Sequence, residues 1–222
     1  MIEILYQDND ILVCVKPAGT LSEESEDSHS LPRLICEEYD IPSLFAVHRL
    51  DREVSGVMVY AKTRESARSL STLVAERKFY KEYLAVIEGR PEKDADTLVD
   101  LLFRDSRKNK TYAVDRKRAG VKEASLEYSL VDSKGESSLV RIILHTGRTH
   151  QIRVQFASRG HSVVGDRKYG SRTKSAGIAL CSHKIEFIHP ATGERVSFSY
   201  LPTNAPLWNE YSDILKKHGA DG

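Results

Sequence analysis

The stretch HRLDREVSG at residues 48–56 runs directly into the apolar segment VMVYA at residues 57–61. Five apolar residues after a Ser-Gly pair predict a buried strand that starts at a turn. An aspartate beside a buried strand is costly unless its charge is compensated. Asp51 is therefore either an ordinary turn residue or part of a functional site, and the rest of the chain must decide between the two.

The remainder of the chain is typical of strands joined by turns. Helices are expected at about 30–39, 63–78 and 149–159, the first two capped by Ser30 and Thr63 and the third ended by Gly160. Strands are expected at 4–7, 11–15, 57–61, 79–87 and 97–103, in two arms between 124 and 145, and at two or more places within 177–201. Strands outnumber helices, which favours an α+β fold with a central mixed, mostly antiparallel sheet and flanking helices.

The composition is that of an ordinary globular protein: 222 residues, 40% hydrophobic, with a net charge of +1. The three cysteines, Cys14, Cys36 and Cys181, are far apart, which indicates reduced thiols in a cytosolic protein. The sequence shows no signal peptide and no apolar run long enough to span a bilayer. We therefore expect a cytoplasmic, monomeric protein that forms a single domain over residues 1–222, since no repeat or low-complexity linker divides it.

Residues 104–123 differ from the rest in charge. They carry eight basic and three acidic side chains, a net charge of +5, which leaves −4 on the remaining chain. A charged run is most often a solvated loop. A concentrated basic segment containing an aromatic residue, here Tyr112, is also what contact with a phosphate backbone requires.

A second polar cluster follows at residues 147–153, GRTHQIR. On a helix over 149–159, Ile152 and Phe156 would share one face, so Arg153 among apolar neighbours should be partly buried. A partly buried guanidinium requires a carboxylate. Asp51 is a candidate for that partner, although the residues alone do not establish that the two meet.

Several other site classes find little support. A metal site from His48, His145, His150 and Asp51 is conceivable, but the close paired spacing of metal ligands is missing, so no metal is expected. The Gly-x-Ser-x-Gly motif of many serine hydrolases does not occur. No glycine loop for phosphates is present, which argues against a nucleotide cofactor.

The motifs together resemble those of the RluA-type pseudouridine synthases, which isomerise uridine to pseudouridine in ribosomal and transfer RNA. Residues 48–56 match the family motif His-Arg-Leu-Asp-x-x-Thr-Ser-Gly except for Val54 in place of threonine. Four further segments resemble family motifs and follow in the same order: 8–19, 81–89, 147–166, and the closing pair at 189–190 and 201–202. The first and last of these four are individually weak, whereas the second and third together, in this order and separation, are a strong match.

The resemblance implies roles for particular residues. Asp51 corresponds to the catalytic aspartate, Tyr83 to the tyrosine that lies against the target base, and Arg153 to the arginine paired with the aspartate. Arg49 corresponds to a residue that helps displace the flipped nucleotide. Val54 lacks a hydroxyl that could support Asp51. We further expect RNA contacts from the following residues: His48, Arg148, His150, Arg116, Lys117 and Arg118.

The resemblance implies the pseudouridine synthase fold, RNA as the partner and no cofactor, since the reaction involves neither redox change nor group transfer. The first motif begins near Met1, so we expect no RNA-binding domain ahead of the catalytic domain. RNA must then be bound by the catalytic domain itself, and residues 104–123 are candidates for that contact. Two alternatives remain: a non-catalytic RNA-binding module on the same scaffold, and a metal-dependent hydrolase that uses the histidines.

Overall fold

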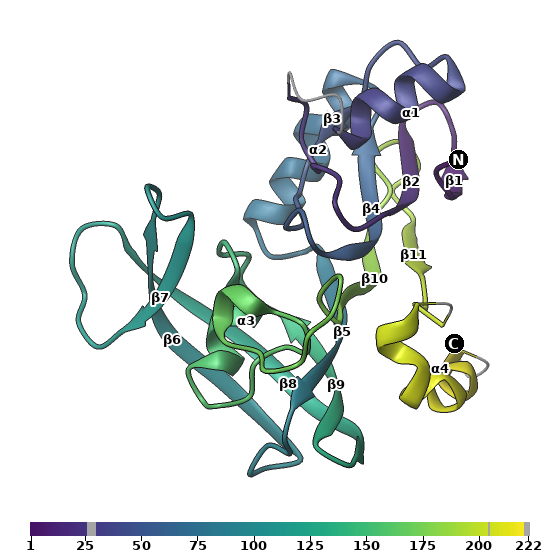
Figure 1. Ribbon diagram of the computed structural model, residues 1–222. Helices are drawn as coiled ribbons and strands as arrows, with labels where there is room; N and C mark the ends of the chain where they lie inside the picture. Colours follow the sequence, from purple (N-terminus) through teal and green to yellow (C-terminus); the bar gives the residue numbers. More distant parts are fainter. Residues whose placement is uncertain (26–29, 204, 220–222) are drawn as a thin grey trace. The chain divides into compact units, whose positions relative to one another are not determined.

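A computed structural model describes residues 1–25, 30–203 and 205–219 (Figure 1). The chain forms two compact units, each built from two separate segments. Unit 1 comprises residues 1–81 and 182–200, and unit 2 comprises residues 82–181 and 201–222. The single domain expected over residues 1–222 stays a prediction.

Unit 1 contains a sheet in the order β1-β2-β4-β10, with β3 beside β4 and β11 beside β10. The pairings β1–β2, β2–β4, β3–β4 and β10–β11 are antiparallel. Its strands and helices are β1 (Ile4–Gln7), β2 (Ile11–Lys16), α1 (Leu31–Tyr39), β3 (Phe45–Ala46), β4 (Ser55–Ala61), α2 (Arg64–Ala75), most of β10 (Leu180–Ile188) and β11 (Arg195–Ser199).

The two helices of unit 1 begin where their caps predict. Ser30 accepts a hydrogen bond from the Arg33 backbone N–H, and Thr63 accepts one from Ser66, so each side chain satisfies a free donor of the first turn. Leu70 of α2 is fully buried against the sheet. This apolar contact packs α2 against β2, which precedes Asp51 in the chain, and β4, which follows it.

The start of β4 depends on a glycine. Gly56 has φ of +117°, and a Cβ there would lie 2.2 Å from the carbonyl oxygen of Ser182 on the neighbouring β10. Only a residue without a side chain allows this close approach of two backbones. The Ser-Gly pair of the opening motif therefore fixes how β4 enters the sheet, directly after Asp51.

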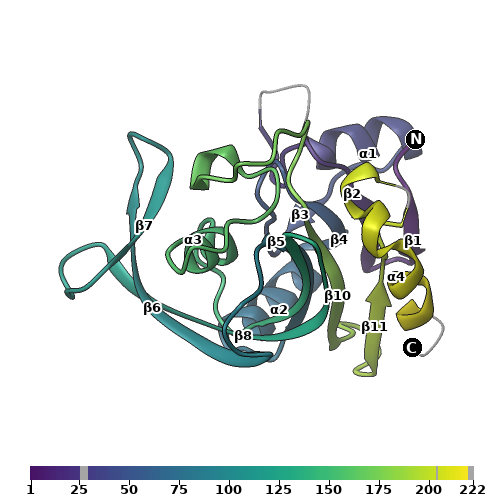
Figure 2. The ribbon, with the colours of Figure 1, turned by 60° about the horizontal axis from the view of Figure 1, so that its bottom comes forward.

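Unit 2 has the strand order β5-β9-β8-β6-β7, with antiparallel pairing throughout this series. α3 packs against β6 and β7 and lies to one side of these strands (Figures 1 and 2). The elements are β5 (Tyr80–Glu88, from Glu82 in this unit), β6 (Ala95–Asp105), β7 (Lys110–Val114), β8 (Val121–Lys134), β9 (Ser137–Leu144), α3 (Gln151–Ala157), the 3-10 helices η1 (Arg167–Tyr169) and η2 (Pro206–Tyr211), and α4 (Ser212–Gly219).

Residues 104–123 are not one loop, as a charged run most often is. They include the end of β6, all of β7 and the start of β8, and Phe103 pairs with Tyr112 in the β6–β7 register. Asp105 accepts the backbone N–H groups of Arg107 and Lys108 in the turn between β6 and β7. Strand pairing and this turn fix the backbone of five of the eight basic residues, whereas the other three, Arg116, Lys117 and Arg118, lie in the loop after β7.

Helix α3 is shorter than the predicted 149–159. His150 has φ of +54°, outside the helical region, so the helix begins at Gln151. At the other end Gly160 adopts φ of +83°, the left-handed conformation expected of it. The sequence also predicts an acidic solvated loop at residues 23–27, of which residues 26 and 27 lie outside the described part of the chain.

The α+β class with largely antiparallel strands is confirmed. Cys14, Cys36 and Cys181 form no disulfide with one another, and Cys14 and Cys181 are buried. Within the described ranges, no helix combines the length and the apolar character that a membrane crossing requires.

Candidate active site

Asp51 lies in a tight turn between β3 and β4, and hydrogen bonds within the turn and from Lys16 and Gly19 fix the backbone of this turn. The Val54 N–H donates to the Asp51 carbonyl at 3.0 Å, which closes the turn. The next carbonyl, that of Arg52, accepts the Gly19 N–H at 2.8 Å and the Lys16 ammonium at 3.0 Å. The carboxylate of Asp51 is thus carried by a backbone segment with several fixed contacts.

Lys16 connects this turn to the end of β2. Its side chain has no exposed surface, and Nζ also reaches the Pro17 carbonyl at 3.0 Å and the Thr20 hydroxyl at 3.5 Å. Burial lowers the pKa of Lys16 to about 8, while the nearby carboxylates of Glu53 and Asp51 oppose that shift. An ammonium has three hydrogens for these three acceptors, so Lys16 fixes the turn from within.

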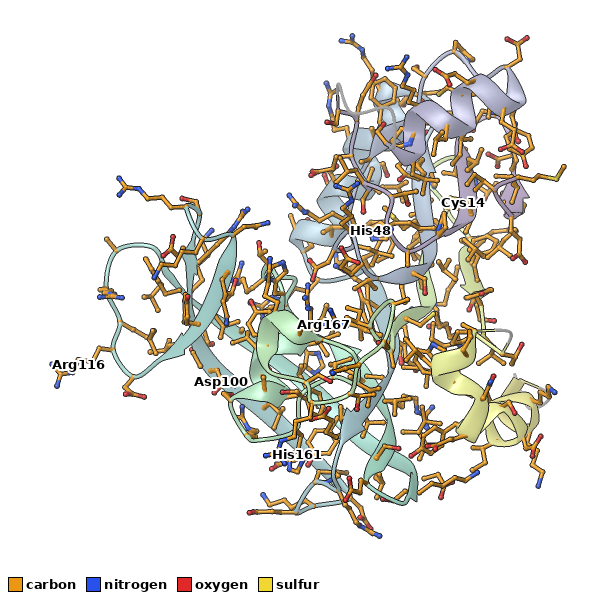
Figure 3. All side chains as sticks on the ribbon, in the orientation of Figure 1. Cys14, His48, Asp100, Arg116, His161 and Arg167 are labelled. Carbon is orange, nitrogen blue, oxygen red and sulfur yellow. The ribbon has the colours of Figure 1, made fainter. Side chains whose placement is uncertain are left out.

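His48, labelled in Figure 3, is buried and precedes Asp51 by three residues. Its Nε2 accepts the Val59 backbone N–H at 3.2 Å, and its ring packs on Phe79 with centroids 5.2 Å apart. Burial, aided by the positive charge of Lys81, lowers the pKa of His48 to about 3. The ring is therefore neutral at physiological pH and supports β4, while its expected contact with RNA stays a prediction.

Val54 replaces the family threonine and is 2% exposed. A hydroxyl there would require a hydrogen-bond partner, whereas the valine side chain needs none. The departure from the motif is therefore compatible with a buried position at the end of the turn.

Arg153 is buried on α3, as the sequence predicts, and its guanidinium has a carboxylate partner in Asp166. Nε donates to Oδ2 of Asp166 at 2.6 Å and Nη2 donates to Oδ1 at 2.8 Å, a two-pronged ion pair. The two side chains are 5% and 1% exposed. Sequence reasoning missed this pairing; the predicted pairing of Arg153 with Asp51 stays a prediction.

Asp166 owes its position to the glycine before it. Gly165 has φ of +83°, and a Cβ there would lie 2.0 Å from the Gly177 carbonyl oxygen. Its N–H donates to the Ser171 hydroxyl, and the Asp166 N–H donates to the Val163 carbonyl. The Gly-Asp pair within the motif at 147–166 was the signal in the sequence that could have identified this carboxylate.

His150 and Arg148, both predicted to contact RNA, lie just before α3. His150 is 8% exposed, and its Nδ1 hydrogen-bonds the Tyr169 hydroxyl at 2.8 Å. Arg148 is half-buried and its Nε donates to the Glu123 carbonyl at 3.0 Å. Both side chains hold parts of unit 2 together, and their contact with RNA stays a prediction.

The other predicted site residues differ widely in exposure. Tyr83 is 5% exposed on β5, where it pairs with Ile142 of β9. Arg49 is exposed and forms an ion pair with Glu23 at 3.0 Å. Arg116, Lys117 and Arg118 are exposed in the loop after β7, and Figure 3 shows Arg116 pointing away from the strands.

The histidines considered as metal ligands have other contacts. His145 lies 2.9 Å from Glu127, His48 accepts from the backbone, and His150 bonds Tyr169. In the part of the chain that the structure describes, no three His, Cys, Asp or Glu side chains gather as a metal-binding group. The chemistry available from the predicted residues is that of a carboxylate, a phenol and a guanidinium.

Comparison with known proteins identifies the class to which this fold and these residues belong. Residues 10–158 match the RNA pseudouridylate synthase family. An RNA pseudouridine synthase of Aquifex aeolicus is 37% identical over 222 residues, covering 89% of this chain and 68% of that protein. The dual-specificity RNA pseudouridine synthase RluA of Escherichia coli is 36% identical over 205 residues, covering 88% of this chain and 90% of that protein.

Solved structures agree on the fold. Human RNA pseudouridylate synthase domain containing 1 superposes with a TM-score of 0.77 at 22% identity, covering 97% of this chain and 95% of that one. Human RNA pseudouridylate synthase domain containing 4 gives 0.75 at 23% identity, covering 97% and 93%.

The chain belongs to the RNA pseudouridine synthase family and is an isomerase that acts on RNA. Within that family it is of the RluA type.

Proposed function

We propose that this enzyme isomerises specific uridines in ribosomal or transfer RNA, with Asp51 as its catalytic carboxylate. The observation that carries the proposal is the motif at residues 48–56, whose aspartate sits in a turn anchored by Lys16 and Gly19. The similarity to the dual-specificity enzyme of E. coli supports RNA substrates of more than one kind.

The chemistry explains why such residues are needed. Isomerisation breaks the bond between the ribose and the uracil nitrogen, turns the base, and joins the ribose to a ring carbon. The target nucleotide must leave its stack to be reached, which costs a few kcal/mol. An ionised carboxylate is suited to attack or stabilise the sugar or base during this exchange. Water would intercept the separated base, so a partly apolar site favours the reaction.

We assign supporting roles to Tyr83 and Arg153. Tyr83, buried on β5, would lie against the base and help move its proton, and Arg153 would pair with Asp51. Because Asp166 already compensates the charge of Arg153 and fixes the orientation of its guanidinium, Arg153 would act on Asp51 by donating a hydrogen bond.

We assign RNA binding to the basic segment, residues 104–123, with Arg116, Lys117 and Arg118 as phosphate contacts. Its charge of +5 on an otherwise acidic chain supports this role. Arg49, His48, Arg148 and His150 are the further RNA contacts of the proposal. Cytoplasmic location and a monomeric state likewise stay predictions.

Replacing Asp51 by asparagine tests the catalytic assignment. We expect Asp51→Asn to abolish formation of pseudouridine and to leave the unfolding transition unchanged, because the side chain keeps its size and loses only its charge. Pseudouridine is measured by nucleoside chromatography of digested RNA, using cellular ribosomal and transfer RNA from cells that lack the gene. Glu53→Gln, in the same turn and exposed, is the matched control and should remain active. Near wild-type turnover by Asp51→Asn would contradict the assignment.

A further inference from the structure

The 3-10 helix η1 touches two parts of unit 2 that the proposed function treats separately. One is the basic segment, residues 104–123, and the other is the ion pair of Arg153 with Asp166. Hydrogen bonds and ring contacts join η1 to both parts, and all of them come from described residues of one unit.

On the side of the basic segment, the contacts fix the turn and the first residues of β7. The Thr111 backbone N–H donates to the Tyr169 hydroxyl at 2.9 Å. Lys168 Nζ donates to the Asn109 carbonyl at 3.0 Å. The Lys110 ammonium lies 5.2 Å from the centre of the Tyr169 ring, within the range of a cation–π contact.

On the side of Arg153, the same tyrosine is again the point of contact. The Arg153 guanidinium carbon lies 5.2 Å from the centre of the Tyr169 ring. The Tyr169 hydroxyl also hydrogen-bonds His150 Nδ1 at 2.8 Å, one residue before α3 begins. Asp166, which holds Arg153 with two hydrogen bonds, is the residue directly before η1.

Tyr169 is a buried side chain whose hydroxyl and ring both contact other residues of unit 2. It is 8% exposed and belongs to the same apolar cluster as Leu102 of β6 and Val154 of α3. Its hydroxyl joins the backbone of β7 to the residue before α3, and its ring contacts one cation from each of the two parts. One side chain therefore contacts both the β7 backbone and the guanidinium of Arg153.

We propose that Tyr169 is a positioning residue that couples phosphate binding by the basic segment to the placement of Arg153. The proposal rests on the function proposed above. Arg107 and Lys108 of the basic segment lie in the turn between β6 and β7, and we extend the proposed phosphate contacts to them. RNA held by this turn would fix Thr111 and Lys110, and through Tyr169 the guanidinium of Arg153. Binding at the segment would then increase the rate of the chemical step as well as the affinity.

A double-mutant cycle on rate constants tests the coupling. The variants are Tyr169→Phe, which keeps the ring and removes the hydroxyl, the pair Arg107→Gln with Lys108→Gln in the β6–β7 turn, and their combination. For each protein the RNA Kd and the single-turnover rate constant at saturating RNA are measured. If Tyr169 had a merely structural role, the two changes would lower the rate constant independently of each other.

In the otherwise wild-type protein, we expect the Arg107/Lys108 pair to raise Kd and to lower the rate constant by roughly three- to tenfold, the range of coupling between neighbouring groups. In the Tyr169→Phe background the same pair should still raise Kd but should lower the rate constant by a smaller factor, because the hydroxyl contacts are lost and the ring contacts remain. Tyr128→Phe is the matched control: Tyr128 is also 8% exposed, and its hydroxyl donates to the Lys93 carbonyl, outside the basic segment. In its background the pair should keep its full effect on the rate.

Lys168→Gln gives an independent test on the surface, where folding is not at risk. It removes the bond to the Asn109 carbonyl and should weaken the coupling in the same direction. Rate effects that simply multiply in both the Tyr169→Phe and Lys168→Gln backgrounds would overturn the inference and leave the proposed function standing. An unchanged Kd for the Arg107/Lys108 pair would instead refute RNA binding at this turn, and the inference with it.

Discussion

At the scale of single residues, the buried pair of Arg153 and Asp166 is the most consequential contact. Each charge is removed from water and is compensated by the other. Such a pair contributes little net stability compared with apolar residues, but removing one partner strands a buried charge. The pair therefore explains how an arginine can be held in a fixed orientation among apolar neighbours.

This gives a prediction for stability and activity together. We expect Arg153→Met to lose activity and ~3–5 kcal/mol of unfolding free energy, because Asp166 is left unpaired. Arg153→Met with Asp166→Leu should recover most of that stability and none of the activity. Denaturant unfolding of the four proteins measures the coupling.

The partly exposed pair of Arg159 with Asp100 is the control, since its side chains are 36% and 18% exposed and Arg159→Met should cost about 1 kcal/mol or less. The same cycle with Asp51→Leu tests the predicted pairing of Arg153 with Asp51. Additive effects in the Asp166 cycle would contradict the account of the buried pair.

His48 predicts how stability depends on pH. Its pKa is about 3 in the folded protein and roughly 6.5 when unfolded, so between these values the unfolded chain binds one more proton. The contribution of the neutral His48 ring to the free energy of unfolding is present above pH ~6.5 and is lost as pH falls, by about 1.4 kcal/mol per pH unit.

We expect His48→Gln to flatten this dependence, because glutamine can accept the Val59 N–H and does not titrate. Urea unfolding from pH 7 to 4.5 measures it, with exposed His145→Gln as the control. An equal acid slope in wild type and His48→Gln would show that His48 is protonated in the folded state.

At the scale of elements, local patterns predict most of the structure. Ser30 and Thr63 mark the starts of α1 and α2 because a cap is a local hydrogen bond. The start of α3 was misplaced because His150 takes a left-handed conformation, which accompanies its contact with Tyr169. Strand β7 was missed although Thr111, Tyr112 and Val114 favour strands, because charged residues lie on both sides of it and the whole of residues 104–123 was treated as one charged run.

The residues of the candidate site also fall into those that the local sequence predicts and those that it does not. Asp51, Tyr83 and Arg153 follow from a motif, so sequence is sufficient to suggest them. Asp166, Lys16 and Tyr169 act through tertiary contacts, and Tyr169 bonds a residue 58 positions earlier in the chain, a separation that no local pattern spans. Their burial and partners emerge only when strands and turns are brought together.

The basic segment provides the prediction at this scale. Replacing Arg116, Lys117 and Arg118 with glutamine should weaken RNA binding across sequences, because these side chains are proposed to bind phosphates. The slope of log Kd against log salt should fall by roughly 0.7–0.9 for each phosphate that the variant no longer binds. Exposed Arg64, Arg68 and Lys217, replaced in the same way, are the control for total charge. An unchanged slope would show that the loop after β7 is a solvated loop that binds no phosphate.

At the scale of the whole molecule, neither unit is a continuous piece of chain. In unit 1, residues 182–200 supply most of β10 and all of β11. Unit 2 includes residues 201–222, which follow them in the chain. The final segment was not among the expected elements, although Pro206 at the start of η2 is a typical helix start. Ser137 of β9 hydrogen-bonds Tyr211 of this segment at 2.9 Å, so the end of the chain completes unit 2.

This arrangement predicts that the C-terminal segment is required for stability. Trp208, Tyr211 and Leu215 are 2%, 0% and 1% exposed, and burying each large apolar side chain contributes about 2 kcal/mol. A chain that stops after Tyr200 should therefore unfold at much lower denaturant concentration, or fail to fold. Trp208→Ala in the full chain tests the packing of this side chain without shortening the chain, and it should lower the free energy of unfolding by about 3–5 kcal/mol. Asn209→Ala, at an exposed neighbour, is the control and should leave the free energy of unfolding unchanged. If the shortened chain and Trp208→Ala both unfold like the wild type, the segment is not part of the folded core of unit 2.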